Sequence, residues 1–284
     1  MSKQGVLRLS FLLYLAFVVY GSLIPFELRP ATFEQAVARF TAIPWLDLGP
    51  GSRADWVANI LLYMPLAFLG CSAIAGRLRS GAARLIAVVF VVAGCIAIAV
   101  AVEFTQIFFA PRTVSLNDLL AETLGSIAGA LTWLFGRRRL AGLAHAFAAG
   151  GRQSMVAAIV AYLMVYVLLA LFPFDFAVST GELADKLGSG SFGWLLASDN
   201  VGSFRQLASL VGETAAVAPL GVLLGLLASR VKLGRTFLVG SALGLLLEIV
   251  QLFVLSSVTQ GASVLARGAG LAAGAFVGHR IRHG

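Results

Sequence analysis

The sequence predicts an all-α polytopic membrane protein with eight transmembrane helices, arranged as two four-helix repeats of the same orientation. Composition is the first reason, because 59% of the residues are hydrophobic and 12% are charged, whereas soluble domains carry roughly a quarter charged residues. The second reason is a series of apolar runs, each close to the ~20 residues that cross a bilayer as a helix. The third is an internal repeat: Glu103-Phe104-Thr105-Gln106 recurs as Glu248-Ile249-Val250-Gln251.

The apolar runs give the helices in order. We expect them at residues 9–26, 56–75, 85–108, 117–135, 154–172, 206–228, 236–255 and 262–279. The first run follows basic residues and so resembles a secretory signal peptide. Its pattern of Tyr14 followed by Pro25-Phe26-Glu27 nevertheless recurs inside the chain, as Tyr162 followed by Pro173-Phe174-Asp175. Because an internally repeated segment is structural, we interpret the first run as a retained helix.

Basic residues mark one end of each helix pair. They are Lys3, Arg8, Arg77, Arg79, Arg84, Arg137–Arg139, Arg152, Arg230, Lys232, Arg235, Arg280 and Arg282. Cytoplasmic loops carry an excess of Lys and Arg, so this pattern places both termini in the cytoplasm. The net charge of +8 therefore reflects membrane topology and contact with anionic lipid headgroups, and it does not indicate a nucleic-acid partner.

The repeat divides the chain into residues 1–140, a basic cytoplasmic linker at 141–152, and a degenerate second module at 153–284. An even number of spans per module makes both copies face the same way. Each module has a proline inside its second helix, Pro65 or Pro219. Small residues recur every fourth position in the last helix of each module, which serves close helix packing or, alternatively, substrate access. These residues are Ala121, Gly125, Gly129, Ala266, Gly270, Gly274 and Gly278.

The two long outer loops cover about residues 27–55 and 173–205. Phe33, Val37 and Phe40 have helical spacing, which predicts a short helix in the membrane interface. Trp45 and Trp194 fit equally well with irregular loops that aromatic residues anchor, so both interpretations stay open here.

Polar residues in the first module gather at the outer helix ends. An ionisable residue at membrane depth costs several kcal/mol and marks a functional site by default. Residues four apart share a helix face, so counting along the helices brings these side chains together. Ser115 or Asn117 is expected to cap the fourth helix. The predicted substrate-binding or proton-coupling residues are Asp55, Asn59, Glu103, Gln106, Arg112, Asp118 and Glu122.

The second module changes this set. The alignment replaces Asn59 with Glu213 and Glu122 with Arg267. A buried arginine needs an anionic partner, so we expect a structural ion pair formed by Glu213, Glu248 and Arg267.

At these residues the chain resembles the VanZ-like membrane protein family. The resemblance rests on Asp55, Asn59, Pro65, Gly70, Glu103, Gln106, Arg112, Ser115, Asp118, Gly125 and Gly129. It covers residues 11–135 well and 160–278 as a weaker second copy. It implies a multi-pass protein of the bacterial inner membrane that acts at the cell envelope, in a family named for resistance to the glycopeptide teicoplanin. The family usually has asparagine where this chain has Glu122.

Three functions fit the sequence. The first is binding or transport, in which the outward acidic site accepts a cationic or amide-bearing group of a lipid-linked envelope molecule or a glycopeptide. The second is a carboxylate-based intramembrane enzyme acting on envelope lipids or peptides. The third is an accessory structural protein without its own substrate. No phosphate-binding loop, haem motif or zinc spacing occurs in the sequence, so we expect no cofactor and no metal. Membrane lipids are the expected general partners.

Overall fold

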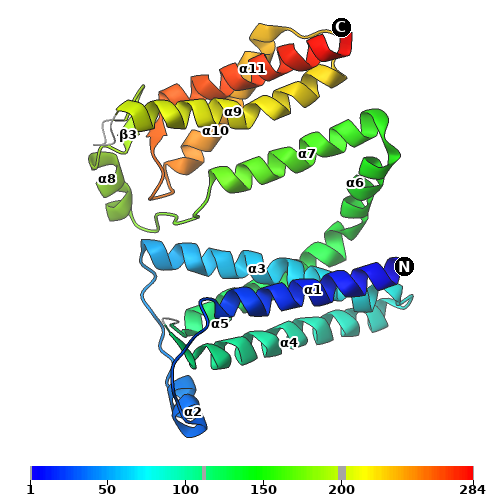
Figure 1. Cartoon of the computed structure of the whole chain (residues 1–284), viewed down its shortest axis with the longest axis vertical. Helices are drawn as coiled ribbons and strands as arrows, with labels where there is room; N and C mark the ends of the chain where they lie inside the picture. The colour runs from blue at the N-terminus through cyan, green and yellow to red at the C-terminus, as the bar shows by residue number, and fades with distance from the viewer. Residues whose placement is uncertain (1, 111–112, 198–202, 284) are drawn as a thin grey trace. The chain divides into compact units, whose positions relative to one another are not determined.

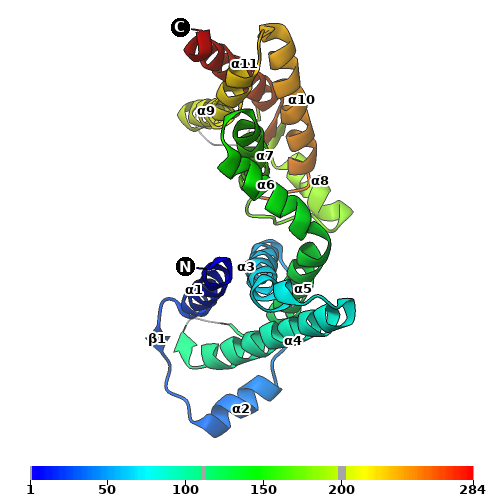
Figure 2. The ribbon, with the colours of Figure 1, turned by 90° about the vertical axis from the view of Figure 1, so that its right-hand side faces the viewer.

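The computed structural model describes residues 2–110, 113–197 and 203–283. The chain forms two compact units, unit 1 (Met1–Arg139) and unit 2 (Leu140–Gly284). In the described ranges, eight helices are long and apolar enough to cross a membrane, and each overlaps one of the eight expected spans. The all-α polytopic fold class is thereby confirmed (Figure 1 and Figure 2).

Unit 1 contains four long helices that lie side by side (Figure 1). They are α1 (Lys3–Leu23), α3 (Pro50–Ile74), α4 (Gly81–Gln106) and α5 (Leu116–Leu131). A basic turn that includes the short helix Ala75–Arg77 joins α3 to α4. After α5 a π-helical turn (Thr132–Gly136) leads into α6 (Arg137–Ala149). The fourth span therefore continues as helix well past residue 135, through most of the segment expected to be a linker.

A short helix lies in the loop between α1 and α3 of unit 1. This is α2 (Phe33–Thr41), which begins at a capping box formed by Thr32 and Gln35. The rings of Phe33 and Phe40 pack against Phe104 of α4, with centroid distances of 5.9 and 5.5 Å. The same loop starts with strand β1 (Glu27–Leu28), which pairs antiparallel with β2 (Phe109–Ala110). The short helix expected in this loop is therefore confirmed, while its place in the membrane interface stays a prediction.

Unit 2 also has four long helices, with a short helix and a strand between the first and the second, although here the short helix comes before the strand. Its long helices are α7 (Gly151–Ala170), α9 (Ser203–Leu227), α10 (Leu233–Gln251) and α11 (Gly261–His283). The loop between α7 and α9 carries α8 (Thr180–Gly188), which the Ser179 side chain caps. Strand β3 (Phe192–Gly193) pairs with β4 (Thr259–Gln260), here in parallel.

Glycines hold the last helix of each unit directly against a neighbouring backbone. A Cβ atom added at Gly125 would lie 2.4 Å from the carbonyl oxygen of Ile60, and one at Gly270 would lie 2.3 Å from that of Thr214. Side chains cannot fit at such distances, so α5 packs closely on α3 and α11 on α9. The small-residue spacing in the sequence therefore serves helix packing.

The outer faces of the helices are apolar. Phe90 on α4 is 73% exposed and Phe135 after α5 is 80% exposed. Surfaces of this kind are stable in contact with hydrocarbon and would aggregate in water. Each unit has its own buried core, around Tyr63 and Leu66 in unit 1 and around Val217 and Leu271 in unit 2.

Candidate functional site

A cavity of about 510 Å³ lies at one end of the unit 1 helices. It sits where α1 and α4 end and where α3 and α5 begin. The basic residues Arg77, Arg84 and Arg137 lie at the opposite helix ends. The polar residues that line the cavity include Ser22, Asp55, Asn59, Glu103, Gln106, Ser115 and Asp118. These residues therefore lie at the same helix ends, as counting residues along each predicted helix led us to expect.

Asp118 is held by two neighbouring side chains. The Asn59 amide donates to Asp118 Oδ1 at 2.9 Å, and the Ser115 hydroxyl donates to Oδ2 at 2.5 Å. Ser115 also accepts from the Asp118 backbone N–H at 3.2 Å and so caps α5. The cap and the two hydrogen bonds fix the carboxylate at the start of α5, facing the cavity.

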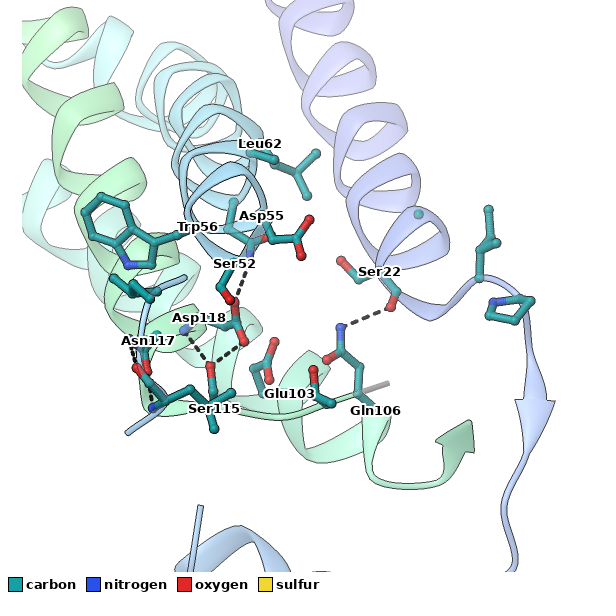
Figure 3. Close-up of a pocket in the computed structure, with 18 residues that line it drawn as sticks. Ser22, Ser52, Asp55, Trp56, Leu62, Glu103, Gln106, Ser115, Asn117 and Asp118 are labelled. Carbon is teal, nitrogen blue, oxygen red and sulfur yellow. Dashed lines mark hydrogen bonds between the residues drawn. The ribbon is translucent and has the colours of Figure 1, made fainter. Parts of the chain in front are cut away.

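Glu103 and Gln106 approach the same space from α4. Both are buried, at 2% and 7% exposure. The Gln106 amide nitrogen donates to the Ser22 carbonyl at the end of α1, at 3.0 Å. Figure 3 shows the carboxylates of Asp55, Glu103 and Asp118 directed toward one another across the cavity. Three helices therefore supply one carboxylate each.

Glu122 does not line this cavity. It lies one helical turn deeper than Asp118 on α5 and is 2% exposed. Its carboxyl is a neighbour of the Tyr63 hydroxyl, although no hydrogen bond of ordinary geometry joins them. Glu122 Oε2 and the Tyr63 hydroxyl have no hydrogen-bond partner among the described residues. Tyr63 was not predicted from the sequence, although it follows Asp55 and Asn59 at the same four-residue spacing.

Asn117 has a different role from the one expected. Its side chain accepts from the Leu46 backbone N–H at 2.8 Å and donates to the Leu46 carbonyl at 3.2 Å. The segment between α2 and α3 is thereby tied over the start of α5. Ser115 is the cap, and Asn117 holds the outer wall of the cavity, which Leu46 also lines.

A comparison with known protein families finds a match that covers unit 1. Residues 10–137 match the VanZ/LLP1 family model. Unit 1 is VanZ-like. The matched range covers all the cavity-lining helices of this unit and amounts to just under half of the chain. No curated protein and no solved structure matches the chain.

Two arginines lie close in sequence to residues of the VanZ-like site. Arg112 lies outside the described residues, so its expected place above the carboxylates stays a prediction. Arg53 donates from Nε to the Leu48 carbonyl at 2.8 Å. Within the described part of the chain, no group of three or more His, Cys, Asp or Glu side chains is arranged to hold a metal ion.

Unit 2 holds a buried arginine where the VanZ-like unit has Glu122. Arg267 Nη1 lies 2.5 Å from Glu248 Oε1 and Nη2 lies 3.6 Å from Glu213 Oε1. Its Nε donates to the Tyr166 hydroxyl at 3.1 Å, and its Nη2 donates to Gln251 Oε1 at 3.4 Å. The structure thus brings together all three residues of the expected ion pair, beside a second cavity of about 420 Å³.

Lys186 is a buried cation that sequence reasoning missed. It lies on α8, outside the spans, and is 4% exposed. Its Nζ donates to the carbonyls of Gln251 and Val254 and, at 2.9 Å, to the Ser257 hydroxyl. Burial lowers the pKa of Lys186 from 10.5 to about 8. The side chain satisfies one carbonyl at the last residue of α10 and one just beyond it, and so fastens α8 to the end of α10.

Proposed function

We propose that unit 1 binds the polar group of a lipid-linked envelope molecule from the outer leaflet of a bacterial inner membrane, and so contributes to teicoplanin-type glycopeptide resistance. The observation that carries this proposal is the cavity in which Asp55, Glu103 and Asp118 converge within a membrane-spanning bundle. Carboxylates at membrane depth cost free energy, so a cluster of them indicates a role in binding or proton transfer.

The orientation of the site supports an outward opening. The cavity lies at the helix ends opposite Arg77, Arg84 and Arg137. By the positive-inside rule the arginine end is cytoplasmic, so the cavity opens at the outer leaflet. A ligand would then arrive from the envelope side.

The lining suits an amphiphile. Ile24, Leu46 and Leu62 contribute apolar surface beside the acidic groups. A polar headgroup could meet the carboxylates while the adjoining chain follows the apolar helix faces, as ligand sites usually combine apolar walls with a few placed polar groups.

Teicoplanin susceptibility tests this proposal. Cells that express the wild type, Glu103→Gln or Glu34→Gln would be compared at equal membrane levels of protein. Glu34 is an exposed acid in the first turn of α2 and serves as the matched control. We expect protection by the wild type and by Glu34→Gln, and its loss with Glu103→Gln. Equal protection by all three would refute a binding role for the buried carboxylate.

An accessory structural role is the second candidate, and the close packing at Gly125 favours it. A Cβ there would meet the Ile60 carbonyl oxygen at 2.4 Å, so α5 cannot keep its place with a larger residue. If Gly125→Leu abolishes protection while Glu103→Gln is silent at equal protein levels, the packed bundle and not the acidic cavity carries the function.

A further inference from the structure

The second cavity lies within unit 2. It has a volume of about 420 Å³, and residues of α7, α9 and α11 line it together with the last residue of α10. Its polar lining includes the Tyr166, Glu213 and Arg267 side chains, whereas Val165, Leu169 and other apolar residues line the rest. An ion pair by itself requires no adjoining cavity, so these polar groups could serve a ligand as well as the packing of unit 2.

Two polar groups at this cavity have hydrogen-bonding capacity to spare. Glu213 Oε1 lies 3.6 Å from Arg267 Nη2, which is an ion pair but too long for a hydrogen bond. Glu213 Oε2 has no hydrogen-bond partner among the described residues. The Tyr166 hydroxyl accepts from Arg267 Nε at 3.1 Å, and within the described part of the chain no acceptor takes its own proton. One acceptor and one donor are therefore left for a ligand.

The charges beside the cavity have opposite signs, which disfavours an ionic ligand. An ammonium group near Glu213 would also approach the Arg267 guanidinium, and a phosphate or carboxylate near Arg267 would also approach Glu213. Like charges so close to each other repel. A hydroxyl avoids both conflicts, because it is uncharged and can donate one hydrogen bond while it accepts another. The polar lining therefore favours an alcohol.

The depth of the site favours a small polar group as well. Arg230 and Lys232 follow α9, so the positive-inside rule places the start of α9 on the outer side. Glu213 comes ten residues after Ser203, the first residue of α9, which places it about 15 Å along the helix axis. The headgroup region is only about 5–8 Å thick on each side of a bilayer, so this is the depth of the acyl chains. An uncharged hydroxyl reaches that depth at a lower cost than a charged headgroup does.

The mouth of the cavity lies between α7 and α9. On the α7 side, Val165 and Leu169 line the cavity and are 54% and 70% exposed. On the α9 side, Gly212 is exposed, and a Cβ atom added there would meet no atom within 4 Å. Apolar side chains with such exposure in a membrane-spanning unit are suited to contact with hydrocarbon. An acyl chain can therefore leave the cavity between these two helices.

We propose that the unit 2 cavity binds a membrane lipid whose headgroup is a small uncharged alcohol. Its hydroxyl accepts from the Tyr166 hydroxyl and donates to Glu213, and its hydrocarbon chain passes Gly212 into the bilayer. The Glu213 side chain is 21% exposed, and rotation about its last bond, which has a broad energy profile, presents a carboxyl oxygen to the ligand. This site is separate from the unit 1 cavity, so the inference does not rest on the proposed function.

Four ligands with the same hydrocarbon chain test the headgroup. The purified full-length chain in lauryldimethylamine oxide, a detergent without hydroxyl groups, would be mixed with oleyl alcohol, methyl oleate, oleylamine or oleate, and native mass spectrometry would count the bound molecules. We expect a single oleyl alcohol per chain. Methyl oleate cannot donate to Glu213, and loss of a hydrogen bond to a charged group should lower its occupancy about tenfold or more. No binding of the alcohol, equal binding of methyl oleate, or tighter binding of the amine or the acid would overturn the inference.

Two matched pairs of variants locate the bound alcohol. Gly212→Leu fills the mouth and should abolish binding, whereas Gly234→Leu, at an exposed position of α10 that also has open space around it, should keep it. Tyr166→Phe should lower the occupancy of oleyl alcohol, whereas Tyr162→Phe should not, because the Tyr162 hydroxyl already donates to the Ala216 carbonyl at 2.7 Å. Unchanged binding in Gly212→Leu or in folded Tyr166→Phe would overturn the inference. If Tyr166→Phe does not fold, the two glycine variants decide.

Discussion

Replacing Arg267 by methionine removes the cation at the centre of the unit 2 polar cluster while keeping much of the side-chain volume. Arg267 is 2% exposed, so water does not replace it. Glu248 would lose its partner at 2.5 Å, and Tyr166 and Gln251 would each lose a hydrogen bond. Glu248 would keep its hydrogen bond from the Gln260 backbone N–H at 2.8 Å.

The expected cost follows from that geometry. Removing one partner of a buried ion pair destabilises a protein by about 3–5 kcal/mol, because the remaining charge is left uncompensated. Replacing Glu248 by glutamine as well removes that charge. We therefore expect the double variant to lose about 2–3 kcal/mol less than the sum of the two single variants, as for residues in one ion-pair network.

Denaturant unfolding of the full-length chain in mixed micelles measures these free energies. Arg230→Met serves as the control, because Arg230 is an exposed arginine in the turn between α9 and α10; it should stay within about 0.5 kcal/mol of the wild type. If Arg267→Met lost less than about 1 kcal/mol, or if the single and double variants were simply additive, the ion pair would not hold unit 2 together.

Three further changes probe the packing and the outer segments. Gly125→Ala should destabilise unit 1 by about 1–3 kcal/mol because its Cβ would strike a carbonyl of α3. The control Gly94→Ala, which has open space around it, should be neutral or stabilising in the same denaturant assay. Equal changes in unfolding free energy for the two variants would contradict the close approach of α5 to α3. Asn117→Ala should lower the free energy of unfolding by about 1–3 kcal/mol, because two hydrogen bonds to Leu46 are lost. Faster backbone hydrogen exchange at residues 42–48 would report the release of that segment. Unchanged exchange would count against a role of Asn117 in holding it. Burial lowers the pKa of Lys186 to about 8, so between pH 8 and 10.5 the unfolded chain holds the proton more tightly than the folded chain, and the free energy of unfolding rises with pH. Subtracting the unfolding free energies of Lys186→Met, measured over the same pH range, isolates this contribution. Identical pH dependence in the wild type and the variant would exclude it.

The sequence was sufficient for the fold because its signals are strong and local. A run of apolar residues of membrane-spanning length has few alternatives to a helix, and all eight runs form helices. The acidic residues could be placed at one end of unit 1 because helix rise and orientation fix depth. Glu103, Asn59 and Asp118 accordingly meet at one cavity.

Side-chain partners depend on packing details that spacing does not encode. Glu122 shares a face with Asp118 and was grouped with the site, yet the close contact of α5 with α3 places it one turn deeper beside Tyr63. Lys186 could not be assigned because its partners are carbonyls at and just beyond the end of α10, 65 and 68 residues away. Which of Ser115 and Asn117 caps α5 likewise depends on where the segment around Leu46 lies, because that segment engages the Asn117 side chain.

The two units carry opposite formal charges at one corresponding position, Glu122 in unit 1 and Arg267 in unit 2, and each side chain is 2% exposed. Arg267 balances Glu248 from within unit 2, whereas Glu122 places a further acid beside Tyr63 in unit 1. Removing Arg267 therefore leaves a buried carboxylate without this partner, and that is why the cost is expected at Arg267 and why Glu248→Gln should relieve part of it.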